Sequence, residues 1–131
     1  MGTEGIVISD LIFYDGPAAT LSFLDGLGEE VLSSDALYNA AAAQVVMDGA
    51  LEELGISTDP WAESASAFIS SIASGRPWNA RKSLREIILG YSEIEKTGRY
   101  YAAAAAACLR FEADKLRFAA VSPKPHRFSF P

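Results

Sequence analysis

The sequence predicts an all-α protein, folded as an antiparallel bundle of four to five helices. Three observations predict this class. Apolar residues recur at the i, i+3, i+4, i+7 spacing of an amphipathic helix over most of the chain. Single glycines stand where these patterns stop. Half of the 131 residues are hydrophobic, which is enough to bury a core without disulfides. We expect one helical domain over residues 1–122 and a Pro-rich tail over 123–131.

The first third of the chain is the least regular part. Residues 5–14, GIVISDLIFY, suit either a strand or a short buried helix, because periodicity does not separate the two at this length. A turn at residues 15–17 leads into a weaker helix over about residues 17–32, in which Gly26 and Gly28 each cost about 1 kcal/mol relative to alanine. Residues 126–130, HRFSF, alternate as a strand does, so the prediction allows a short strand or extended segment at each terminus.

Two helices with clear start and stop signals follow. Ser34 is the expected N-cap of a helix that runs to Leu54 and ends at Gly55. Tyr38, Val45 and Val46 are expected to widen its inward stripe, which consists of Leu37, Ala40, Met47, Ala50, Leu51 and Leu54. The next helix is expected over 59–75, with Asp59 as N-cap and Pro60 at the first helical position. Its inward face holds Trp61, Ala65, Phe68, Ile69 and Ile72.

The strongest periodic pattern predicts a helix from a cap at Asn79 to a stop at Gly98. Its buried stripe consists of Leu84, Ile87, Ile88, Tyr91 and Ile94. A last helix is expected over about residues 99–121, opening with the run YYAAAAAACL, and Pro123 prevents its continuation.

The last helix carries two apolar rows. One row consists of Ala105, Leu109, Ala113, Leu116 and Ala120, and the other of Tyr100, Ala104, Ala107, Phe111 and Phe118. A peripheral helix needs only one such row. Either the helix lies between other helices, or the second row, represented by Tyr100, Phe111 and Phe118, docks a partner or a second copy of the chain.

Composition and charge exclude several classes of function. The formal net charge of -6 argues against a nucleic-acid binder that works by general phosphate neutralisation. The single cysteine cannot form an intramolecular disulfide. Neither a secretory signal pattern nor an apolar run of about 20 residues is present, so we expect a cytoplasmic protein with no membrane segment.

Catalytic and metal signatures are missing from the sequence. The only histidine, His126, lies in the tail, so a histidine-dependent triad is not expected. A di-iron bundle needs two Glu-x-x-His motifs, and a phosphate loop needs a GxxxxGK pattern. Cys108 follows six alanines, an apolar setting that makes a thiol inert. We therefore predict no catalytic residue, no metal and no cofactor.

The charged residues sort into two poles if successive helices run antiparallel. The acidic pole includes Asp48, Glu52, Glu53 and Glu63. The basic cluster opposes the dipole at a helix start and consists of Arg76, Trp78, Arg81, Lys82 and Arg85. Its cations and the flat face of Trp78 could bind a carboxylate or a phosphate, or they could be only surface.

We expect a non-catalytic, acidic interaction module, similar in size and charge to immunity or antitoxin-type inhibitors and to small regulatory adaptors. Its partner is a protein, which could be basic, or a second copy in a homodimer. The alternative is a small-molecule anion-binding or enzyme module that uses the basic helix start at residues 76–85.

Overall fold

A computed structural model describes residues 7–121, with side chains described for residues 7–115. All secondary structure in these residues is helical, so the predicted all-α class is confirmed. The elements in chain order are α1 (Ile8–Asp10), a π-helical turn η1 (Leu11–Asp15), α2 (Pro17–Gly26), α3 (Ser34–Glu53), a 3-10 turn η2 (Asp59–Trp61), α4 (Ala62–Ala73), α5 (Pro77–Glu95) and α6 (Tyr100–Val121).

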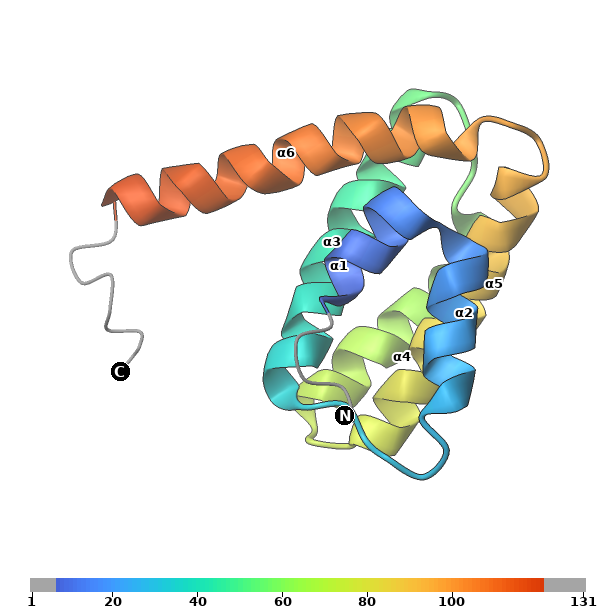
Figure 1. Cartoon of the computed structure of the whole chain (residues 1–131), viewed down its shortest axis with the longest axis vertical. Coiled ribbons are helices and arrows are strands. Elements are labelled where there is room, and N and C mark those ends of the chain that lie inside the picture. The colour runs from blue at the N-terminus through green and yellow to red at the C-terminus, as the bar shows by residue number, and fades with distance from the viewer. Residues whose placement is uncertain (1–6, 122–131) are drawn as a thin grey trace.

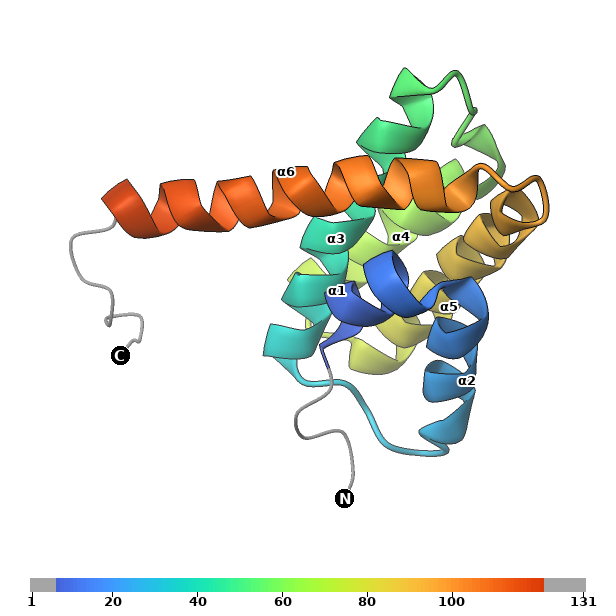
Figure 2. The same ribbon diagram turned by 45° about the horizontal axis from the view of Figure 1, so that its top comes forward.

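The helices α1 to α5 form the body, and α6 lies across one end of it (Figure 1). The α4–α5 hairpin is the most extensive helix pair, α2 packs on α5, and α6 packs on α3. The second half of α6 continues well beyond the body in both ribbon views (Figures 1 and 2). This projecting end makes the molecule differ from a closed bundle.

The strand alternative for residues 5–14 is wrong over the described part, because residues 8–15 are helical. Side-chain hydrogen bonds attach this segment to α3. The Ser9 N–H donates to Asn39 Oδ1 at 2.8 Å, and Asn39 Nδ2 donates to Ser9 Oγ at 3.1 Å. Ile8, Ile12 and Phe13 are buried, so the apolar run forms a short buried helix. The predicted strand at 126–130 lies outside the described residues.

Tyr100 holds the π-helical turn against α6. A π-turn pairs the carbonyl of residue i with the N–H of residue i+5, as Leu11 O does with Gly16 N at 2.7 Å. For Ile12 the corresponding residue is Pro17, which has no N–H. The hydroxyl of the fully buried Tyr100 donates to Ile12 O at 2.7 Å and satisfies this carbonyl.

Replacing Tyr100 with phenylalanine should therefore lower the free energy of unfolding by about 1–3 kcal/mol, because the Ile12 carbonyl would stay buried without its donor. Urea denaturation followed by circular dichroism measures the change. Tyr38→Phe is the matched control, because Tyr38 is 61% exposed, and its stability should not change. Equal stability of Tyr100→Phe and the wild type would show that this hydrogen bond contributes nothing.

Several predicted helix boundaries need correction. Ser33, and not Ser34, caps α3, and its Oγ accepts from the Ala36 N–H at 3.1 Å. Asn79 lies inside α5, which starts two residues earlier because Pro77 fits the first turn of a helix. Asp59 begins a 3-10 turn and its own N–H is bonded to Ser57 Oγ at 3.1 Å. The helix predicted over 17–32 ends at Gly26.

Candidate interaction surface

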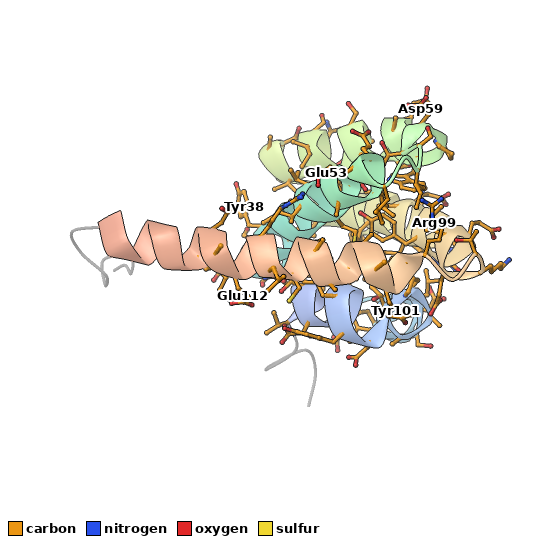
Figure 3. The ribbon with its side chains drawn as sticks, turned by 90° about the horizontal axis from the view of Figure 1, so that it is seen from above. Tyr38, Glu53, Asp59, Arg99, Tyr101 and Glu112 are labelled. Atoms are coloured by element: carbon orange, nitrogen blue, oxygen red, sulfur yellow. The ribbon has the colours of Figure 1, made fainter. Side chains whose placement is uncertain are left out.

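A row of apolar residues lies open on the outer side of α3. Tyr38 is 61% exposed and Val45 is 59% exposed, while Ala42 is exposed and Gly49 is partly exposed. Their spacing of four, three and four residues places them on one face of the helix. In Figure 3, Tyr38 lies at the edge of the body, on the side toward which the end of α6 projects. We call this row, Tyr38, Ala42, Val45 and Gly49, the α3 face.

The prediction that Tyr38 and Val45 widen the inward stripe of α3 is wrong. Ala40, Met47 and Leu51 are almost fully buried, as predicted. At about 100° per residue, Tyr38 and Val45 lie on the opposite side of the helix from these residues. The spacing of the apolar residues in the sequence already indicated this position, because a single helix needs only one apolar stripe to join a core.

Carboxylates lie at both ends of the α3 face. Asp35 and Glu52 continue its spacing by three residues at each end, and both are exposed. Glu52 accepts a hydrogen bond from Thr58 Oγ1 at 2.7 Å. Glu53 forms an ion pair with Arg110 of α6. The α3 face is therefore an apolar strip between acidic ends.

An open groove of about 310 Å³ adjoins the α3 face where α6 leaves the body. It is lined by Ala42, Val46, Phe111, Asp114 and Lys115. The ring of Phe111 meets Phe13 edge-on at 5.3 Å between centroids, and Lys115 Nζ lies 5.4 Å from the Phe111 centroid. The groove thus joins the α3 face to the first residues of the projecting end of α6.

One of the two apolar rows of α6 is buried against the body, and the other is exposed. Tyr100, Ala104, Ala107 and Phe111 face the body and are buried. Leu109 is 74% exposed, and Ala105 and Ala113 are exposed with it. The expectation that α6 lies between other helices is therefore wrong in the described residues, because α6 packs through one face only.

The predicted docking row is also not a free surface. Tyr100 and Phe111 are both packed against the N-terminal segment and buried. Phe118 lies outside the residues whose side chains are described. The sequence correctly showed two rows, but it could not show which of them faces the body.

Asp48, which the sequence places in the acidic pole, belongs to a largely buried hydrogen-bond cluster. Its carboxylate accepts from Gln44 Nε2 at 2.6 Å, from Tyr91 Oη at 2.8 Å and from Trp61 Nε1 at 3.1 Å. Burial raises the pKa of the Asp48 carboxyl, and these hydrogen bonds act in the opposite direction. Asp48 is therefore a structural residue that joins α3, η2 and α5.

The other acidic residues are separated. Glu52 and Glu53 stand at the end of α3, as described above. Glu63 lies across from Lys82 and Glu86 along an open hollow of about 430 Å³ between α4 and α5. A hollow lined by one lysine and two glutamates has mixed charge, so Glu63 does not extend the acidic end of the α3 face.

The basic cluster mainly holds the fold together. Arg81 Nη1 donates to the carbonyl of Glu30 at 2.6 Å, and its guanidinium lies 5.0 Å from the Trp78 ring centroid. Arg85 forms two hydrogen bonds with Asp25 of α2, at 2.7 and 3.2 Å. The Arg85 guanidinium lowers the pKa of the Asp25 carboxyl. The contacts of Arg81 and Arg85 attach the start of α5 to α2 and to the loop after it.

The anion-binding alternative therefore has fewer available groups than the sequence suggested. Arg81 and Arg85 are engaged with Glu30 and Asp25, while Arg76 is the exposed N-cap of α5 and Lys82 lines the hollow beside Glu63. The structure brings Trp78 and Arg81 together and turns Arg85 toward α2. It does not direct the five residues at one common point.

Two other features, a metal site and a membrane-spanning helix, are not found in the part of the chain that is described. Among residues 7–115, no three histidine, cysteine or acidic side chains are grouped as a metal site requires. None of the helices described here combines the length and hydrophobicity needed to cross a bilayer. Comparisons with protein-family models, with curated proteins and with solved structures gave no match.

Proposed function

We propose that this protein is a non-catalytic interaction module that binds a protein partner through the α3 face and the adjoining groove. The observation that carries the proposal is the exposure of Tyr38 and Val45 in one continuous apolar row. Isolated exposed apolar residues are ordinary, whereas a continuous strip rimmed by polar groups is typical of an interaction surface.

The gain from covering this surface is large enough for recognition. Fully burying a valine or an aromatic side chain contributes about 1.5–3 kcal/mol. Tyrosine is also frequent among the residues that dominate binding energies. The spacing of the α3 face suits a partner helix laid along it, because side chains at intervals of three and four residues interlock with those of a second helix.

Charge favours a basic partner. The net charge of -6 attracts cationic proteins at long range, and Asp35 and Glu52 place carboxylates at the ends of the strip. Inhibitors of the immunity or antitoxin type and small regulatory adaptors bind in this manner, and we assign the protein to this broad class.

A photo-cross-linking residue in place of Tyr38 should capture the partner, whether another protein or a second copy, in cells that make both. Binding to the purified, identified partner is then measured by calorimetry. Val45→Asp should weaken binding at least about tenfold, because a buried charge replaces an apolar contact.

Leu89→Asp is the matched control, because Leu89 is 36% exposed on α5, away from the α3 face, and its substitution should leave binding unchanged. The same cross-linker at position 89 controls for non-specific capture. The proposal fails if Tyr38 captures nothing beyond this control, or if Val45→Asp and Leu89→Asp bind equally well.

A further inference from the structure

We propose that the starts of α3 and α5 together bind a small tetrahedral oxyanion, which is inorganic phosphate or the phosphate group of a small monoester. The two helix starts meet beside the turn between α4 and α5 (Figures 1 and 2). Ser34, Ser71 and Arg76 line a hollow of about 130 Å³ there, which we call the Ser71 hollow. Of the basic cluster described above, only Arg76 lines this hollow.

The side chain of Ser71 indicates a ligand in this hollow. Ser71 is only 8% exposed, and its hydroxyl has no hydrogen-bond partner among the described residues. Its neighbour Ser74, by contrast, donates to the Ser70 carbonyl at 2.7 Å. Buried hydroxyls are normally hydrogen-bonded, because an unpaired one loses its contacts with water without replacement. The Ser71 Oγ is not fully enclosed and opens to the hollow that Ser71 lines, where a ligand would supply the missing partner.

The two helix starts add N–H donors and partial positive charge. The first N–H groups of an α-helix have no acceptor within the helix, and they carry the positive end of its dipole. At α3, Ser33 Oγ accepts from the Ala36 N–H. No side chain caps the start of α5, where Arg76 is the N-cap. Two long helices that begin at the same hollow therefore favour an anion there.

Arg76 supplies the full positive charge. Within residues 7–115 its guanidinium forms no ion pair and no hydrogen bond, whereas Arg81 and Arg85 are bonded to Glu30 and Asp25. A cation at a helix start is unfavourable by itself, because the start of the helix is also positive. An anion in the hollow would be attracted by both and would offset their repulsion.

Little negative charge opposes an anion in this hollow. None of the described residues that line it is acidic. The end of α4 borders the hollow, but the carbonyls of Ser70, Ser71 and Ile72 already accept from N–H groups of the following turn at 2.9–3.1 Å. Asp35, in the first turn of α3, lines a separate pocket between α3 and the N-terminal segment.

The size of the hollow and its donors favour a phosphate group. A volume of about 130 Å³ equals the share of about four water molecules in liquid water, which suits a small ion. The donors come from α3, α4 and the start of α5, so they approach from several directions. A carboxylate has only two acceptor oxygens in one plane, whereas a phosphate group has at least three arranged around a tetrahedral centre.

Isothermal titration calorimetry of the full chain with inorganic phosphate tests the site, with sodium chloride holding the ionic strength constant. The wild type should bind phosphate at millimolar concentrations or below. Arg76→Gln and Ser71→Ala should each weaken binding about tenfold, because each removes a hydrogen bond to a charged group. Circular dichroism should show that both variants keep the fold.

Two matched controls and two further anions complete the experiment. Lys82→Gln removes a cation from α5 and Ser66→Ala removes a hydroxyl from α4, both at exposed residues outside the hollow, so both variants should bind phosphate as the wild type does. Acetate should bind more weakly than phosphate. Methyl phosphate separates the two sources of the phosphate group: tighter binding than inorganic phosphate would identify a monoester as the ligand, and weaker binding would identify the free ion.

Four results would each overturn the proposal. These are a wild type that does not bind millimolar phosphate, an Arg76→Gln or Ser71→Ala variant that binds as the wild type does, a Lys82→Gln variant that binds as weakly as Arg76→Gln, and acetate that binds as tightly as phosphate. None of them bears on the proposed function, because the Ser71 hollow and the α3 face share no residue.

Discussion

Replacing Asp48 with alanine should lower the free energy of unfolding by about 2–4 kcal/mol, the largest loss that we expect from one polar residue here. Three donors, from Gln44, Trp61 and Tyr91, would lose the acceptor that they share. Tyr91 is fully buried and Trp61 nearly so, and each buried donor left unpaired costs about 1–3 kcal/mol. Chemical denaturation of both proteins at neutral pH measures the difference.

The control is Asp48→Asn, which keeps one oxygen as acceptor for Trp61 and Tyr91. Gln44 can keep a hydrogen bond with residue 48 by turning its side-chain amide, because Gln44 Oε1 is buried with no hydrogen-bond partner in the described structure. We therefore expect Asp48→Asn to cost much less than Asp48→Ala. Equal losses in the two variants would contradict the assignment of the acceptor role.

Asp48 should also make stability depend on pH in an unusual direction. Burial raises its pKa in the folded protein above the unfolded value. Folding therefore favours the protonated Asp48 carboxyl. The stability that this group contributes is fully present below the unfolded pKa and is lost as the pH rises through the folded pKa. The stability of the wild type relative to Asp48→Asn should fall over that interval. A difference that stays constant or rises with pH would contradict this sign.

Replacing Gly90 with alanine should destabilise the protein by about 3 kcal/mol, the upper end of the usual cost of overpacking. A Cβ at position 90 would lie 2.2 Å from Trp61 Cε3 and 2.8 Å from Trp61 Cδ2. The indole cannot move aside easily, because its Nε1 is bonded to Asp48 and its ring packs edge-on against Tyr91 at 5.4 Å between centroids.

Gly49→Ala is the matched control for Gly90→Ala. Both glycines lie inside long helices, but a Cβ at Gly49 meets nothing within 4 Å. Here alanine should stabilise the protein by about 0.5–1 kcal/mol through helix propensity alone. Thermal unfolding of the two variants should shift in opposite directions. Shifts of the same sign would show that the contact with Trp61 does not decide the effect at Gly90.

The candidate surface was only partly predictable. The basic cluster was visible in the sequence, but its partners, Asp25 and the Glu30 carbonyl, lie more than fifty residues away, where no local pattern reaches. Asp48 looked like any acid near a helix end until Tyr91 and Trp61 were placed around it. Tyr38 and Val45 were predicted to join the core because they are apolar, although their spacing from Ala40 and Met47 places them on the opposite side of α3.

The sequence alone determined the helical class, the positions of the long helices and the absence of a recognisable catalytic motif. These properties depend on local spacing, on caps and on glycine and proline, which act over a few neighbouring residues. Tertiary structure alone decided that α6 packs through the row containing Phe111 and leaves Leu109 outside, and that the outer side of α3 stays open. Both outcomes depend on which helices meet in space, and the number of apolar rows on a single helix does not fix that.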